Sequence, residues 1–467
     1  MAAVPIETDY LVIGAGAIGM AFVDTLLTDT DAQIVMVDRH HRPGGHWNEA
    51  YPFVRLHQPA EQYGVNSREL GHGMKEAAGL NAGMYGLSNG AELTAYFDQI
   101  MQQRFLPSGR VRFMPMSQVV GSHDVESLLT GDRQSVTVRR KVVDATHSRM
   151  QVPSTTPPRY TVAPGVRCVP LNELVRLAQP QAGYVIVGAG KTGMDACLWL
   201  LEQGVAPDDI LWIMSRDVWL LDRANIQSGD EFFMNTWSSL TSQLEAVVAA
   251  DSPDDLMLRL ESAGELMRID PRVQPTAYHG AILSKAELAQ LRRIRGIVRL
   301  GRVKSIDATE IHLEQGSVPL PPDALVVDCS AIGIPSVGAV PVWSGDRITP
   351  QWVRSFSTVF SASLIAHIEA TFDDDDAQKN ALCTPLVPPT LATDWLRMLE
   401  VSMNNQQRWS KHPQLQKWLA ESRLNSFFHS AMRIQPDETE KIALMQRYRQ
   451  TIKPAALHLS ELIASLA

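Results

Sequence analysis

The chain has little of what marks several common classes of protein. It contains only four cysteines in 467 residues, with no Cys-x-x-Cys pair and no metal-ligand spacing, so we expect no metal site and a reducing, cytoplasmic setting. No apolar run reaches the roughly 20 residues of a membrane helix, and no signal-peptide pattern precedes Gly14, which argues against a membrane location. The formal net charge of −9 argues against nucleic acid as a partner.

The chain does carry one glycine pattern twice. Gly14-Ala-Gly16-Ala-Ile-Gly19 and Gly188-Ala-Gly190-Lys-Thr-Gly193 each follow a short apolar run and precede an apolar helical pattern. In such a loop the first glycine allows a tight turn, the second lets the backbone approach a pyrophosphate, and the third lets helix and strand pack closely. One copy is a weak signal, but two in strand–turn–helix context predict two dinucleotide sites, with a flavin and a nicotinamide nucleotide as the expected pair.

The residues after the first loop fit a nucleotide site. Residues 18–27 predict a helix and residues 33–37 a strand that ends at Asp38. A carboxylate about 20 residues beyond the last glycine can accept hydrogen bonds from ribose hydroxyls; the alternative is a solvated group at a strand end. The residues expected to contact the first nucleotide are those of the loop and the strand end: Gly14, Gly16, Ala17, Ile18, Gly19, Asp38 and Arg39.

The second loop has different residues at the ribose position. The strand predicted over residues 210–214 ends at Ser215-Arg216, without an acid. A guanidinium binds phosphate through several charge-assisted donors, so this pair favours the 2′-phosphate of NADPH over NADH; the alternative is an ordinary surface arginine. The residues expected around this nucleotide, including two further cations, are Gly188, Gly190, Lys191, Thr192, Gly193, Ser215, Arg216 and Arg223.

The order of these signals predicts an α/β fold with two Rossmann-like dinucleotide-binding domains and a helical C-terminal region. We expect the first part of the FAD domain in residues 1–180, the NADPH domain with a helical insertion in residues 181–333, and a return to the FAD domain followed by helices in residues 334–467. Oligomerisation through the C-terminal region is possible, and so is a role for that region as a roof over the substrate cavity.

Three segments between these signals carry more specific expectations. The Pro-rich stretch 153–170 is interpreted as a linker, and residues 228–290 as mostly helical. Within the second, Tyr278-His279-Gly280 either faces the substrate or forms a loop, and the loop is favoured. The acidic run 373–376 is interpreted as a solvated loop rather than a metal site.

Together these motifs resemble those of the flavin-containing monooxygenase-like branch of the two-dinucleotide-binding-domain flavoproteins. The shared features run in order over most of residues 8–370: the first fingerprint, a Gly-Gly-x-Trp segment, a Tyr-Pro-x-x-Arg segment, the second fingerprint and a turn similar to Ala-Thr-Gly. The resemblance implies that FAD and NADPH bind at the first and second loops. It also implies further FAD contacts along the flavin, near its ring and at adenine: Gly44, Gly45, His46, Trp47, Leu56, His57, Gln58 and Val119.

The chain departs from this branch in a way that bears on the reaction. N-hydroxylases and Baeyer–Villiger enzymes of the branch carry F-x-G-x-x-x-H-x-x-x-[YF] before the second fingerprint, whereas only Gly165 of that pattern is present here. The resemblance implies a monooxygenase that inserts oxygen into an organic small molecule through a C4a-(hydro)peroxyflavin. An NADPH-dependent flavoprotein reductase or oxidase without oxygen insertion is the alternative, and a flavin-bound sensor is a third reading, against which the intact second fingerprint argues.

Three residues are candidates for a catalytic role beside the flavin ring. His46 and His57 can donate hydrogen bonds or titrate near neutral pH, and Asn66, after Tyr63-Gly-Val, is within reach of the flavin edge. For each histidine a satisfied structural side chain is the favoured alternative, because nothing local fixes its role. The identity of the substrate lies in cavity shape and is not encoded by any local motif.

Overall fold

The computed structural model describes residues 5–71, 73–372 and 375–466. The first unit is built on a mainly parallel sheet whose central strand β1 leads into the first glycine loop. Its strands, in spatial order, are β21 (Trp343–Ser344), β22 (Arg347–Ile348), β8 (Arg133–Asp144), β1 (Ile6–Ile13), β2 (Ile34–Val37) and β5 (Val111–Met114). β6 (Ser117–Val120) and β7 (Asp124–Ser127) extend β8 as an antiparallel hairpin, and β3 (Gly64–Val65) pairs with β4 (Arg68–Glu69).

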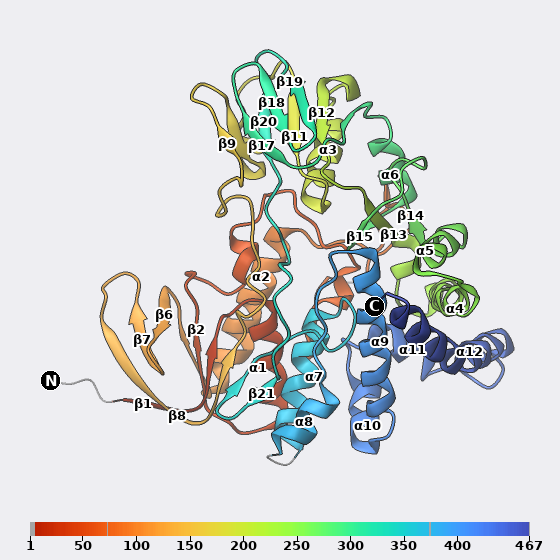
Figure 1. The fold of residues 1–467 in the computed structure, drawn as a ribbon. Helices are drawn as coiled ribbons and strands as arrows, with labels where there is room; N and C mark the ends of the chain where they lie inside the picture. The colour runs from red at the N-terminus through yellow and green to blue at the C-terminus, as the bar shows by residue number, and fades with distance from the viewer. Residues whose placement is uncertain (1–4, 72, 373–374, 467) are drawn as a thin grey trace.

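Helices cover this first sheet (Figure 1). They are α1 (Ala17–Asp29), α2 (Gly90–Ile100), α7 (Thr358–Thr371) and α8 (Asp376–Leu382). α1 and α7 come from opposite ends of the sequence and pack together, with Thr25 and Ser363 joined by a hydrogen bond between their hydroxyls. The return of the chain after residue 334 to complete the first unit is therefore seen directly in β21, β22 and α7.

The second unit repeats the arrangement at the top of Figure 1. Its five strands are parallel, with β11 again central and leading into the second glycine loop. In order they are β10 (Cys168–Pro170), β20 (Leu325–Asp328), β11 (Tyr184–Val187), β12 (Ile210–Ile213) and β16 (Gly296–Val298). α3 (Lys191–Glu202) and α6 (Lys285–Leu291) pack beside it, and a four-stranded sheet adjoins it: β19 (Gly316–Pro319), β18 (Glu310–Leu313), β17 (Val303–Ile306) and β9 (Thr161–Val162).

The stretch interpreted as a linker is partly structured. β9 pairs with β17 and β10 pairs with β20, so both belong to sheets of the second unit. Sheet membership therefore changes before residue 161 and not at the expected boundary near residue 180. These strands contain only two and three residues, too short to give a periodic signal in a Pro-rich segment.

The stretch 228–290, expected to be mostly helical, contains helices but also two strands, which form a small sheet with a strand that precedes the stretch. α4 (Phe233–Ala249) and α5 (Pro253–Ser262) accompany β13 (Val218–Asp222), β14 (Leu266–Met267) and β15 (Ala277–Leu283). Tyr278, His279 and Gly280 lie in β15, so the favoured loop reading was wrong. The register of β15 against β13 shifts at His279–Gly280, a bulge that interrupts the alternation expected of a strand.

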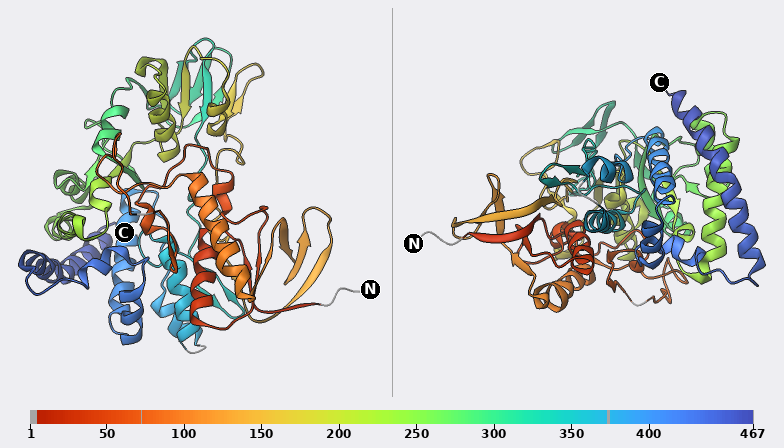
Figure 2. Two further views of the ribbon diagram at one scale, coloured as in Figure 1. Left: turned by 180° about the vertical axis from the view of Figure 1, so that it is seen from behind. Right: turned by 90° about the horizontal axis from the view of Figure 1, so that it is seen from below.

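The C-terminal region is helical, as expected. It consists of α9 (Ala392–Trp409), α10 (Pro413–Glu421), α11 (Ser426–Ala431) and α12 (Thr439–Ala464). In the right-hand view of Figure 2, α12 runs alongside α4 of the insertion. Trp237 of α4 meets Phe428 and Tyr448 edge to face, at centroid distances of 5.5 and 4.9 Å. The C-terminal helices α11 and α12 are thus packed onto α4 of the insertion.

Candidate functional site

Both glycine loops line a single cavity. The cavity has a volume of about 1670 Å³ and its walls come from both units, the insertion and the C-terminal helices. Each loop lies at the carboxyl end of its central parallel strand, where open α/β sheets bind their ligands. A volume of this size exceeds the roughly 300–1000 Å³ of an ordinary small-molecule pocket, and it therefore has room for more than one ligand.

The first and third glycines of each loop are required by the protein itself. Gly14 and Gly188 have φ of +99° and +145°, in the region that favours glycine. A Cβ on Gly19 would lie 2.0 Å from the Gly14 carbonyl oxygen, and one on Gly193 would lie 2.2 Å from that of Gly188. These positions set the turn and the close packing of helix against strand.

Neither backbone conformation nor packing within the protein requires glycine at the second position of each loop. Gly16 has φ −75° and Gly190 has φ −81°, both extended conformations that any residue adopts. A Cβ on Gly190 would meet no heavy atom within 4 Å, and one on Gly16 would be 3.5 Å from the Cα of Gly45. Both positions line the cavity. An open, extended glycine at this point fits the approach of a pyrophosphate to the backbone, so the residues present fit two dinucleotides.

Asp38 lies at the end of β2, on the cavity wall, as expected. Its Oδ2 accepts a hydrogen bond from the Ala15 N–H at 2.6 Å, and its Oδ1 accepts bonds from the His40 N–H and the His40 Nδ1–H, both at 2.8 Å. The hydrogen bond to Asp38 raises the pKa of His40. A carboxylate offers about four lone-pair positions, so one remains free for a ribose hydroxyl. Arg39, beside it, also lines the cavity.

The two candidate histidines both line the cavity but stay neutral. Burial lowers the pKa of His46 to about 4, with His40 adding to the effect. Burial also lowers the pKa of His57 to about 3, assisted by Lys191 and Arg223. Neither ring therefore titrates near neutral pH, contrary to one of the roles expected for them. Trp47 lies next to His46, with ring centroids 4.7 Å apart.

Other residues predicted for the FAD site divide into those on the cavity wall and those behind it. The wall includes Ala17, Ile18, Gly45, Leu56, Gln58 and Val119. Gly44 lies behind it, at φ +123°, where it shapes the Gly44-Gly45 turn. Asn66 is not on the wall either: its Oδ1 accepts a hydrogen bond from the Ser422 hydroxyl at 3.0 Å. The placement of Asn66 at the flavin edge is therefore not what the structure shows, because its amide binds the C-terminal region instead.

The three cations predicted around the second nucleotide have different surroundings. Arg216 lines the cavity and makes no ion pair with any residue that the structure describes, so its charge is available to an anion. Lys191 also lines the cavity but is ion-paired with Asp195. Thr192 lies on the wall, whereas Ser215 does not.

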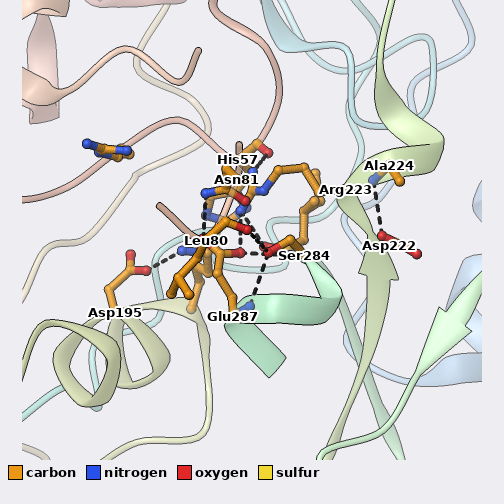
Figure 3. Close-up of polar contacts among 12 residues, drawn as sticks. His57, Leu80, Asn81, Asp195, Asp222, Arg223, Ala224, Ser284 and Glu287 are labelled. Atoms are coloured by element: carbon orange, nitrogen blue, oxygen red, sulfur yellow. Dashed lines mark hydrogen bonds and ion pairs between the residues drawn. The ribbon is translucent and has the colours of Figure 1, made fainter. Parts of the chain in front are cut away.

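Arg223, the third cation, is an interior residue. It is 1 % exposed, and its Nη2 forms an ion pair with Glu287 at 2.9 Å. Its Nη1 donates to the carbonyl oxygen of His57. Figure 3 shows these groups converging with Asn81 and Ser284. Despite burial, which raises it, the pKa of Glu287 is lowered to about 2 by Arg223 and Lys191. Arg223 thus fixes the segment that carries His57, and its charge is already matched; the structure does not support it as a phosphate contact.

The insertion and the C-terminal helices complete the wall. Tyr278, His279 and Gly280 of β15 line the cavity, which is the alternative that the sequence left open for them. So do aromatic and aliphatic residues of the C-terminal region: Trp395, Leu399, Met403, Phe427, Phe428 and Tyr448. These residues lie far from the glycine loops in sequence, and their place on the wall agrees with the roof over the cavity that was one of the alternatives for the C-terminal region.

The part of the chain that the structure describes contains no cluster of three or more potential metal ligands. Of the acidic run, Asp373 and Asp374 lie outside the described residues, Asp375 caps α8, and Asp376 forms an ion pair with Lys141 at 2.7 Å. No helix within the described ranges is long and apolar enough to cross a membrane.

No family model matches the chain. It is, however, 53% identical over 420 residues to "Uncharacterized protein Rv2000" of Mycobacterium tuberculosis, covering 90% of this chain and 78% of that protein. "Uncharacterized protein Mb2023" of Mycobacterium bovis matches with the same identity and coverage. The chain belongs to this family.

Solved structures show which fold the family has. A cyclohexanone monooxygenase from Rhodococcus sp. Phi1 bound to NADP+ matches with a TM-score of 0.51 at 12% identity, covering 84% of this chain and 91% of that one. An oxidized steroid monooxygenase bound to NADP matches with a TM-score of 0.50 at 13% identity, covering 78% and 85%. The fold expected from the resemblance is therefore confirmed: it is that of the two-dinucleotide-domain flavoprotein monooxygenases.

Proposed function

We propose that this protein is an FAD-dependent, NADPH-using monooxygenase of an organic small molecule. The observation that carries the proposal is that two glycine loops, each with an open second glycine, line one cavity. A hydride passes between two nucleotides only if their reactive rings meet, and a shared cavity allows that. Free thiols at all four cysteines fit a cytoplasmic setting for this chemistry.

FAD is assigned to the first unit. The backbone of the first glycine loop and the N-terminus of α1 would hold the pyrophosphate, and the free lone pair of Asp38 would hold the ribose. The segment of Leu56, His57 and Gln58 would lie near the flavin ring, where Arg223 keeps the His57 carbonyl in place. FAD, when bound, supplies hydride acceptance and reaction with O₂.

NADPH is assigned to the second unit, with Arg216 as the contact for its 2′-phosphate. Arg216 lines the cavity and has no carboxylate partner within the described ranges. A guanidinium with unused donors suits a phosphate. Lys191 contributes less, because Asp195 already neutralises it.

The chain's own contribution to oxygen insertion is to keep the reacting centre dry. The wall of the cavity is rich in aromatic and aliphatic side chains from α9, α11 and α12, and the two histidines on it are neutral. A low-polarity site protects an activated oxygen species from proton transfer and early loss as peroxide. O₂ and a small organic molecule are thus the proposed co-substrates.

An NADPH-dependent reductase or oxidase without oxygen insertion is the second candidate. The observation that favours it is the loss of Phe and His from the segment around Gly165. Both candidates need the two nucleotides, so they differ only in the fate of the oxygen atoms.

Purified, FAD-loaded protein tests the proposal. Anaerobic addition of NADPH should bleach the flavin, and the return of isotopically labelled O₂ with substrate should give a product that carries the label. A bleached flavin that yields only hydrogen peroxide with every substrate would favour the oxidase. A flavin that NADPH does not reduce would overturn both candidates.

A further inference from the structure

Arg354 is a buried guanidinium on the wall of the cavity. It lies in the segment between β22 and α7 and is 7% exposed. Its Nη1 donates to Asn425 Oδ1 at 2.6 Å, its Nη2 donates to the Leu424 carbonyl oxygen at 3.4 Å, and its Nε donates to the Ser357 hydroxyl at 3.2 Å. All three acceptors are neutral. An arginine has five N–H groups, so two remain for another partner.

The positive charge of Arg354 has no counterion among the residues that the structure describes. None of the described carboxylates lies within ion-pair distance of it. Burial alone lowers the pKa of Arg354 to about 9, which still leaves the group charged at neutral pH. The contrast is Arg223, equally buried in the same molecule, which has Glu287 as its partner. A buried charge without a partner is costly, and its position on a cavity wall points to a ligand that supplies the opposite charge.

The carboxylates on the cavity wall are committed elsewhere. Among the described lining residues only Asp38 and Glu49 are acidic, and both contact His40 beside the first glycine loop. Apart from its three neutral hydrogen-bond acceptors, Arg354 has aromatic neighbours. The Phe360 ring lies 3.4 Å from its Cζ, a cation–π contact that holds one face of the guanidinium. The Phe428 ring lies 5.9 Å from the same Cζ, and Phe356, Trp395, Leu399 and Phe427 are further apolar residues of the cavity wall.

We propose that Arg354 binds a carboxylate of the substrate, so that the substrates of this protein are organic acids with an apolar body. The carboxylate would take the two free N–H groups of Arg354, and the apolar body would lie against the aromatic side chains of α9 and α11. Two N–H groups in a fixed plane match the two oxygens of a carboxylate. That the bound acid is a substrate rests on the proposed function. The binding of its carboxylate by Arg354 does not depend on any reaction with oxygen.

Calorimetric titration of the FAD-loaded protein with matched ligands tests the proposal. The probes are phenylalkanoates of increasing chain length and the corresponding carboxamides, which share a body and differ in charge. We expect at least one acid to bind about tenfold or more tighter than its amide, because a charge-assisted pair replaces a neutral contact.

Two variants remove the charge in different ways. Arg354→Met deletes the guanidinium. Asn425→Asp supplies an internal carboxylate, with almost no change in shape, at the side chain whose Oδ1 now accepts a hydrogen bond from Arg354 Nη1 at 2.6 Å. In both we expect the preference for the acid over the amide to disappear. Arg408→Met, an exposed arginine of α9 that is not on the cavity wall, removes one charge from the same region and should keep the preference.

The proposal fails if no acid of the series binds, if acids and amides bind equally to the unaltered protein, or if the preference survives in both charge-removing variants. Another negative charge that could lie near Arg354 is that of the reduced flavin ring. If Arg354→Met shifts the flavin reduction potential but leaves acid-over-amide discrimination intact, the guanidinium serves the cofactor and the proposal is overturned. Acid preference without any labelled product would instead leave the anion site standing and refute the monooxygenase assignment.

Discussion

Replacing Gly190 by alanine distinguishes a role of this residue in folding from a role in ligand binding. The backbone there is extended, with φ −81° and ψ −178°, so alanine adds no backbone strain. Its Cβ would meet no heavy atom within 4 Å. The position precedes α3 as its N-cap, where alanine is less favourable than glycine, but alanine also restricts the unfolded chain, which offsets part of that cost. We therefore expect the free energy of unfolding to change by no more than about 1 kcal/mol.

The effect on NADPH should be much larger. The methyl group would project into the cavity where a pyrophosphate must approach the backbone. Loss of one charge-assisted N–H···phosphate bond costs about 1.5–3 kcal/mol, which corresponds to roughly a 10- to 150-fold rise in Kd. FAD content should be unchanged, because the first loop lies in the other unit.

The assay is titration of the FAD-loaded Gly190→Ala protein with NADPH, beside a denaturant melt. Gly193→Ala is the informative contrast, since its Cβ would lie 2.2 Å from the Gly188 carbonyl oxygen and should cost stability as well as binding. If Gly190→Ala binds NADPH as tightly as the unaltered protein while remaining folded, the second loop is not the pyrophosphate site and the argument from its open glycine is wrong.

Three further predictions address the other parts of the site. Arg216→Ala should weaken NADPH by roughly 10- to 150-fold through loss of a charge-assisted contact and leave NADH almost unaffected in the same titration; equal losses for both nucleotides would contradict a 2′-phosphate contact. Gly16→Val should purify without FAD, and a yellow variant with full flavin content would remove FAD from the first loop. His57 is neutral in the fold, with a pKa of about 3 against roughly 6.5 in the unfolded chain. The unfolded chain therefore gains the proton as pH falls, and the folded protein does not. Between pH 7 and pH 5 the unaltered protein without FAD should lose about 2 kcal/mol more of its free energy of unfolding than the His57→Gln variant, as measured by denaturant unfolding. Equal losses would mean that the histidine is not buried.

The elements that could be predicted from sequence are those whose signals are local. The strand, glycine loop and helix of each unit were expected at the right places, because turn geometry and the periodicity of apolar residues depend on only a few neighbouring residues. β15 was not recognised because the contact that requires a glycine within it comes from a distant segment of the chain. Gly280 has φ +65°, and a Cβ there would lie 2.3 Å from the Phe356 ring. A glycine that makes room for a side chain of another segment is indistinguishable, in sequence, from a glycine of a turn.

Sequence is similarly limited for charged residues, because the role of a cation depends on whether the fold places an anionic partner beside it. Lys191, Arg216 and Arg223 were alike in sequence as cations near a phosphate site. In the structure Lys191 pairs with Asp195, one turn further along the same helix, whereas Arg223 pairs with Glu287 of α6, which no local pattern connects to the loop. A cation with a built-in partner has its charge already satisfied and stabilises the fold, whereas a cation on a cavity wall without one is stabilised by what binds there. By this reasoning the cavity of a chain whose net charge is −9 is left with two unmatched, non-exposed guanidinium groups among its described residues: Arg216 in the second unit and Arg354 below the C-terminal helices. In the proposed assignment Arg216 binds the 2′-phosphate of the nucleotide and Arg354 binds the carboxylate of the substrate, so the two unmatched charges would hold different anions.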